Sequence, residues 1–164
     1  MSAPASFIVR RAAAADLPAL GRLGALLIRA HYAFDSQRFM APRGDPEQGY
    51  SRFLAQQLND DDVVVFVAES RETAEVVGYV FAGLEPASWK ELREASGFIH
   101  DVAVDPAARR GGVATALLEA AIDWLRSRGT PRVMLWTAER NDEAQRLFAR
   151  IGFRRTMVEM TLEL

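Results

Sequence analysis

Two β-branched segments separated by a five-residue, mostly polar stretch constrain the fold of this chain more than any other feature. VVVFVAES (residues 63–70) and VVGYVFAGLE (residues 76–85) have the composition of strands, and RETAE between them is typical of a hairpin turn. A further strand is predicted at Phe98–Val104. Strands that follow one another at such short intervals favour antiparallel pairing.

The hydrophobic period changes in the second half of the chain. Apolar residues recur at helical spacing over Val113–Arg128, and Gly129 is placed to end that helix. Arg132–Thr137 then has the pattern of a strand, and Asp142–Ile151 has the pattern of a second helix. This alternation of strands and helices predicts parallel pairing at one side of the sheet.

The two ends of the chain supply the remaining elements. Phe7–Arg10 is an expected edge strand, Asp16 is placed to cap a helix over residues 17–34, and a short helix is expected over Tyr50–Leu58. The last residues alternate between apolar and polar side chains, which predicts an antiparallel strand with one buried face at Val158–Leu164. The 164 residues fit one domain, residues 1–164, of the α/β class with a mixed sheet and helices on its faces.

Composition excludes several classes of site. The formal net charge is -2, so no global charge attracts nucleic acid. The absence of cysteine excludes disulfides, thiolate zinc sites and a cysteine nucleophile, and two histidines alone predict no metal centre. No signal peptide and no apolar segment of about 18 residues is recognisable. We therefore expect a soluble cytoplasmic protein with no membrane or nucleic-acid partner.

The segment RRGGVAT, Arg109 to Thr115, lies between a predicted strand and a strongly periodic helix. A helix N-terminus presents unpaired N–H groups and a partial positive charge. Gly111 and Gly112 would let a phosphate approach the main chain, and the two arginines add positive charge beside them. A flexible, solvated loop is the alternative explanation of the two glycines, but their position favours anion binding.

The same segment resembles a signature of the GNAT-type N-acetyltransferases. Arg109, Gly112 and Ala114 have the spacing of the [Q/R]-x-x-G-x-[G/A] signature with which that family binds acetyl-coenzyme A. Upstream, VAVDP is similar to the family's fourth strand and its Val-x-Pro. Downstream, the family pattern N-x-x-A-x-x-L-[YF]-x-x-x-G-F is matched by Asn141, Ala144, Leu147, Gly152 and Phe153. The match extends from Ile99 to Phe153.

The resemblance implies a twisted, mostly antiparallel sheet with helices on both faces and a splay between strands four and five. The pantetheine arm of acetyl-CoA would pair with the main chain of Val102, Ala103 and Val104. Its pyrophosphate would be held by the turn at the start of the helix, whose residues are Arg109, Arg110, Gly111, Gly112, Val113, Ala114 and Thr115. Asn141 has two interpretations, a hydrogen bond to the cofactor or an N-cap of the next helix.

The catalytic residues are less evident, because Phe148 occupies the position at which many family members carry a tyrosine acid. Trp136 occupies a position at which some members carry an acidic base. His100, expected on the same strand face as Val102, is the candidate general base, with a structural histidine as the alternative. Weaker candidates for a base near the predicted splay are Asp101 and Glu139. The resemblance also places Glu85, Glu91 and Glu94 in a connection that could border the acceptor site, and Tyr32 and Tyr50 in segments that often form the wall of the acceptor pocket in that family.

These features predict direct transfer of an acetyl group from acetyl-CoA to the primary amine of a small molecule or peptide. The alternative is a non-catalytic acyl-CoA sensor of the same fold, which the absent tyrosine keeps open. A homodimer is compatible with the sequence. No metal is expected in the site.

Overall fold

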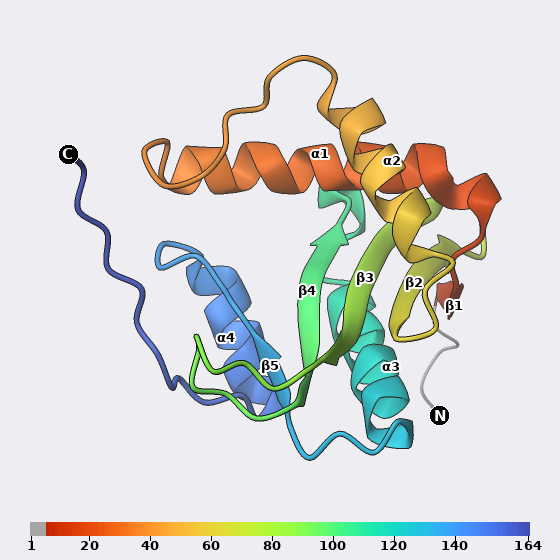
Figure 1. The fold of residues 1–164 in the computed structure, drawn as a ribbon. Coiled ribbons are helices and arrows are strands. Elements are labelled where there is room, and N and C mark those ends of the chain that lie inside the picture. Colours follow the sequence, from red (N-terminus) through yellow and green to blue (C-terminus); the bar gives the residue numbers. More distant parts are fainter. Residues whose placement is uncertain (1–5) are drawn as a thin grey trace.

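One five-stranded sheet organises the protein, as seen in a computed structural model that describes residues 6–164 (Figure 1). Strand order follows the sequence, β1-β2-β3-β4-β5, with antiparallel pairing throughout except between β4 and β5, which are parallel. The strands are β1 (Phe7–Arg11), β2 (Val63–Ser70), β3 (Val76–Glu85), β4 (Ser96–Val104) and β5 (Val133–Leu135). The mixed α/β sheet predicted from the sequence is confirmed; residues 1–5 of the predicted domain lie outside the described residues.

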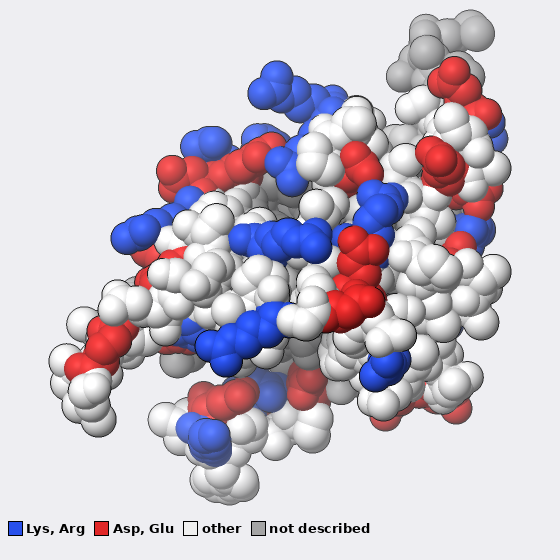
Figure 2. All heavy atoms as spheres, turned by 90° about the horizontal axis from the view of Figure 1, so that it is seen from above, with Lys and Arg blue, Asp and Glu red and all other residues white. Residues whose placement is uncertain are grey.

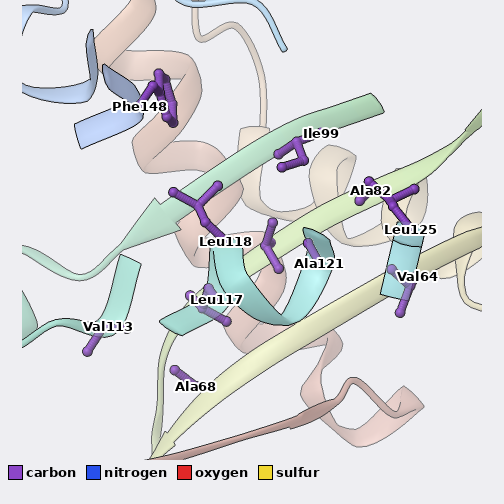
Figure 3. Packing of buried hydrophobic residues seen from close by; sticks show 11 residues of the cluster. Val64, Ala68, Ala82, Ile99, Val113, Leu117, Leu118, Ala121, Leu125 and Phe148 are labelled. Atoms are coloured by element: carbon purple, nitrogen blue, oxygen red, sulfur yellow. The ribbon is translucent and has the colours of Figure 1, made fainter. Parts of the chain in front are cut away.

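Helices cover both faces of this sheet. One face packs on α1 (Leu17–Phe34) and α2 (Pro46–Gln57), and the opposite face packs on α3 (Val113–Ser127) and α4 (Asp142–Ile151). In the core on the face covered by α3, residues such as Leu117 and Leu118 lie against side chains from the strands (Figure 3). Among the described residues, no helix combines the length and apolarity needed to cross a bilayer.

Local hydrogen bonds explain one difference in a predicted helix start and one in a predicted helix cap. The second helix begins at Pro46 because Asp45 caps it, accepting from the Gln48 N–H at 3.0 Å. Asp16 was expected to cap α1 but does not. Its carboxylate instead accepts from the Ala13 N–H at 2.8 Å and pairs with Arg10 at 2.7 Å.

The predicted C-terminal strand is wrong. Residues 154–164 have no strand partner in the described part of the chain, and Val158, Met160 and Leu162 are 68%, 89% and 83% exposed. In Figure 1 the dark-blue segment runs away past α4 instead of along β5. Alternation of apolar and polar side chains predicts that an extended segment has one apolar face. It does not predict which part of the protein, if any, packs on that face.

A close approach of α1 and α2 positions Tyr50. A methyl group on Gly24 would lie 1.9 Å from Cδ1 of Tyr50, whereas a methyl group on Gly49 would meet no atom within 4 Å. Glycine to alanine inside a helix normally stabilises by up to about 1 kcal/mol. We expect Gly49→Ala to do so, and Gly24→Ala to lower the free energy of unfolding by about 1–3 kcal/mol because it overpacks the helix contact. Urea unfolding of both variants measures the difference; equal effects would contradict this packing.

Candidate active site

The turn between β4 and α3 has a backbone that few residues adopt. It begins with the 3₁₀ turn Pro106–Ala108 and then places Arg110 at φ 66° and Gly112 at φ 80°. Gly112 is the N-cap of α3 and provides no side-chain cap. The left-handed conformation at Gly112 explains why glycine stands there, where helices usually begin with Ser, Thr, Asp or Asn.

This turn leaves a row of backbone donors free. The first N–H of α3 to be used is that of Ala116, which donates to the Gly112 carbonyl at 3.0 Å. The N–H groups of residues 110–115 have no acceptor among the described residues. A Cβ on Gly112 would meet nothing within 4 Å, so the space over the turn is open. Free donors at a helix N-terminus with open space before them can bind an anion such as a pyrophosphate.

Arginines flank the turn on two sides. Arg109 and Arg110 are exposed, and Nε of Arg109 lies 3.5 Å from the Val104 carbonyl oxygen. From α1, Nη1 of Arg22 contacts Oδ2 of Asp105 at 2.6 Å. Asp105 also accepts from the Ala107 N–H, and these bonds lower the pKa of its carboxyl group. The turn is therefore held in place by a helix of the opposite layer.

Strands β4 and β5 separate beside this turn. Their last parallel pair joins Ile99 to Leu135, where β5 ends, while β4 continues to Val104. The other edge of this stretch of β4 is paired with β3. The backbone of residues 102–104 therefore has no strand partner on its β5 side among the described residues. The predicted splay is confirmed, and an extended ligand can add to this edge through main-chain hydrogen bonds.

A β-bulge places His100 in this opening. Phe81 pairs with Asp101 and Ala82 pairs with Ile99, so His100 is the additional residue of β4. Its ring lies between two phenylalanine rings, with centroids 4.7 Å from Phe81 and 5.0 Å from Phe98. The expectation that His100 shares a strand face with Val102 is wrong, because the bulge breaks the alternation. Val102 packs in the core on the α3 side, whereas the Phe81 ring belongs to the core on the α1 side.

His100 has a carboxylate partner. Its Nε2 lies 3.3 Å from Oε1 of Glu85, at the end of β3. Burial lowers the pKa of His100 below its ordinary value, and the negative charges of Glu85 and Asp101 oppose that shift. The imidazole is consequently neutral at pH 7. One ring nitrogen can donate to Glu85 while the other retains a lone pair that can accept a proton.

A buried carboxylate with two phenols lies on the same face. The Tyr50 hydroxyl donates to Oδ2 of Asp101, and the Tyr79 hydroxyl donates to the same oxygen at 3.3 Å. Burial raises the pKa of Asp101, while the two hydroxyl donors oppose the shift. Burial and the Asp101 charge raise the pKa of Tyr50, so this phenol keeps its proton. The cluster joins α2 to the centre of the sheet.

Tyr50 also borders a cavity of about 420 Å³ between α2 and the segment after α1. Most of its wall is apolar, and it includes Met40, Pro42, Gly49, Tyr50 and Phe53. Asp101 and Tyr50 were separate candidates in the sequence, and the fold brings them together. Tyr79 was missed, although a tyrosine within an otherwise apolar strand was the available signal, since a buried hydroxyl needs a partner.

Three further candidate residues do not join this cluster. Asn141 caps α4, accepting from the Ala144 N–H at 3.2 Å, and its side-chain NH₂ group stays available as a donor. Trp136 is 74% exposed and lies edge-on to Phe98. Glu139 is exposed beside Arg155. No group of three or more metal-ligating side chains converges within the described residues.

Phe148 lies in the core. It is 7% exposed and packs in the cluster formed with α3, 6.0 Å from the Phe153 ring. We expect Phe148→Tyr to lower the free energy of unfolding by about 1–3 kcal/mol, because its hydroxyl would be buried without a partner. Phe53→Tyr is the matched control, since Phe53 is 41% exposed and water can solvate the added hydroxyl. Equal stability of the two variants would show that the Phe148 ring edge reaches a polar opening.

Comparison with known proteins places this geometry in a family. The model of the acetyltransferase (GNAT) family matches residues 29–153, so the chain belongs to that family. A mycothiol acetyltransferase from Amycolatopsis mediterranei is 34% identical over 96 residues, which cover 58% of this chain and 31% of the relative. The chain thus spans about a third of that protein's length.

Solved structures show the same fold. A mutant protein from Bacillus halodurans has a TM-score of 0.80 at 24% identity, with 96% of this chain and 99% of that chain covered. A predicted acetyltransferase from Clostridium acetobutylicum, solved with acetyl-CoA, has a TM-score of 0.72 at 16% identity, with 96% of each chain covered.

Proposed function

We propose that this protein transfers the acetyl group of acetyl-CoA to a primary amine. The observation that carries the proposal is the continuity of two binding features, the unpaired edge of β4 and the free N–H groups of the turn that follows it. An extended arm ending in a pyrophosphate fits an unpaired strand edge that leads into an anion site. The family membership supports the same ligand.

Different residues would bind different parts of acetyl-CoA. Val102, Ala103 and Val104 would pair with the pantetheine arm, and the backbone of residues 110–115 would bind the pyrophosphate, with Arg109 and Arg110 adding charge. The side-chain NH₂ of Asn141 would donate to the arm while its oxygen caps α4. The bound thioester supplies an electrophilic acyl carbon and a thiolate leaving group.

His100 would act as the general base. The attacking amine forms a C–N bond as the C–S bond breaks, and it must lose a proton in the process. Neutral His100 has a free ring nitrogen for that proton, and Glu85 stabilises the imidazolium that results. The departing thiolate needs a proton from water or a phenol, because Phe148 has none to give. Asp101 supplies buried negative charge near a cationic acceptor.

The acceptor would enter beside α2. The cavity next to Tyr50 and the Asp101 carboxylate together favour a small molecule with an apolar part and an amino group. The mycothiol acetyltransferase relative is compatible with a small-molecule acceptor, and a peptide amine is the other acceptor class. A non-catalytic acyl-CoA sensor is the second candidate function, favoured by the buried Phe148 at the usual acid position.

Ligand binding and turnover distinguish these functions. At a hundredfold excess over its Kd, acetyl-CoA is expected to raise the free energy of unfolding by about 2.7 kcal/mol. Acetyl-pantetheine, which lacks the pyrophosphate, should stabilise less. An unchanged melting temperature at millimolar acetyl-CoA would contradict the proposal. Thiol release measured with a panel of amines then separates an enzyme from a sensor, which would bind without turnover.

A further inference from the structure

A connected series of aromatic rings crosses the candidate active site. The ring centroid of Phe53, on α2, lies 5.8 Å from that of Phe81, which in turn lies 4.7 Å from His100. Phe98 continues this aromatic series, with its centroid 5.0 Å from His100 and 5.2 Å from Trp136. The two ends are accessible, since Phe53 is 41% and Trp136 is 74% exposed. A ligand that reaches the candidate base therefore meets aromatic side chains in both directions along the series.

The apolar cavity beside α2 adjoins one end of the aromatic series. Phe53 and Tyr50, whose ring centroids lie 5.6 Å apart, both line this cavity of about 420 Å³. A cavity of this volume is in the range of small-molecule sites. In the series, the single ring of Phe81 separates Phe53 from His100. A ligand ring in the cavity is therefore one side chain away from the candidate base.

One carboxylate oxygen beside this cavity is free to bind a cation. Tyr50 and Tyr79 both donate to Oδ2 of Asp101. Oδ1 of the same carboxylate has no donor among the described residues. Because no fully buried side-chain oxygen or nitrogen in that part of the chain lacks a partner, Oδ1 reaches solvent. Glu85 places a second carboxylate 3.3 Å from the His100 ring. Carboxylates and aromatic faces both attract an ammonium group.

The outer surface above the cavity does not favour a ligand of one charge sign. Seen from above, the face that carries α1 and α2 has basic and acidic side chains interspersed among uncharged ones (Figure 2). The formal net charge of the whole chain is only -2. The charge of the bound molecule is therefore set by the carboxylates at the site itself, which favour a cation.

We propose that the amine bound in this site is an arylalkylamine, which has a primary ammonium group joined to an aromatic ring by a short alkyl chain. This inference rests on the proposed function and names the class of its acceptor. The ring would occupy the cavity against Phe53, and the ammonium would lie between Oδ1 of Asp101 and the His100 ring. A sugar amine fits less well, because its hydroxyl groups would lose water against an apolar wall without gaining hydrogen bonds.

Isothermal titration of the protein with CoA present tests the ligand class without requiring turnover. Phenethylamine should bind about tenfold or more tightly than the sugar amine glucosamine, because only the former buries an aromatic ring. Phenethyl alcohol has the same ring but no ammonium, and it should bind about tenfold or more weakly than phenethylamine. The proposal would be overturned by a phenethylamine affinity no higher than that of either comparison ligand, or by no detectable binding of phenethylamine.

Phe53→Ala locates the ring of the ligand. This variant should weaken phenethylamine binding by about tenfold, while glucosamine binding changes less than about threefold. Trp89→Ala is the matched control, since Trp89 is 94% exposed and lies outside the aromatic series. Circular dichroism checks the fold of both variants. Unchanged phenethylamine affinity in Phe53→Ala, or an equal loss in Trp89→Ala, would overturn this placement of the ligand.

Thiol release from acetyl-CoA, measured on the same samples, separates this inference from the proposed function. Phenethylamine that binds as expected but releases no thiol would support the ligand class and contradict acetyl transfer. Glucosamine that is acetylated faster than phenethylamine would support acetyl transfer and overturn the ligand class.

Discussion

Gly112→Glu is expected to abolish acetyl-CoA binding while the domain stays folded. The new side chain would place a negative charge and bulk in the open space before the free N–H groups of the turn. Two like charges about 4 Å apart repel by about 4 kcal/mol near a protein surface, which corresponds to an affinity loss of about a thousandfold. Isothermal titration with acetyl-CoA measures this change.

Gly129→Glu is the matched control for this variant. Gly129 follows the same helix at its other end, has φ 77°, and a Cβ there also meets nothing within 4 Å. The two variants therefore carry similar backbone strain and the same added charge, but only one is at the proposed pyrophosphate site. Wild-type affinity in Gly112→Glu, or equal losses in both variants, would show that the turn is not the anion site.

His100→Ala is expected to lower turnover by about 10²- to 10⁴-fold, the usual contribution of a general base. Acetyl-CoA affinity should change little, since the cofactor contacts are expected to be main-chain groups of β4 and the turn. His31→Ala is the control, because it removes the other histidine, which bonds the Leu27 carbonyl within α1. Unchanged turnover in His100→Ala would assign this ring a structural role between Phe81 and Phe98.

The pH profile separates the two roles of His100. A base must be neutral to accept a proton, and burial lowers the pKa of His100, so its neutral form persists to lower pH. The acid-side fall of kcat should therefore lie below about pH 6.5, the ordinary histidine pKa. Glu85→Gln should shift that fall to still lower pH, because the Glu85 charge favours the protonated ring. A structural histidine would produce no such shift.

Local patterns sufficed to predict most of the fold. The strand pair at residues 63–85 and the helix at residues 17–34 follow from side-chain periodicity and turn chemistry, and the structure has them at those positions. The glycine turn was predicted because its function depends on backbone conformation and helix polarity, which are local properties. The C-terminal strand failed for the opposite reason, since periodicity defines a face and tertiary contacts decide what covers it.

The interior of the candidate site could not be predicted in the same way. The grouping of Tyr50, Tyr79 and Asp101 depends on the register of β3 and β4 and on the packing of α2 against the sheet. The position of the His100 ring depends on a β-bulge, and no residue pattern in the sequence predicts that bulge. The tyrosine–aspartate grouping and the bulge both result from pairing between residues far apart in the sequence. Local sequence patterns contain little information about such pairing.

The bulge at His100 has a consequence for the distribution of charge. In an unbroken strand, Asp101 would point to the same side as Ile99, into the wholly aliphatic and aromatic layer beneath α3. An isolated carboxylate there would have no hydroxyl to bond and would destabilise the fold. The additional residue reverses the alternation of side chains along β4. Asp101 therefore lies beside Tyr50 and Tyr79, and Val102 packs on the same side of the sheet as Ile99. A single strand thereby serves an apolar layer on one side and an ionisable layer on the other.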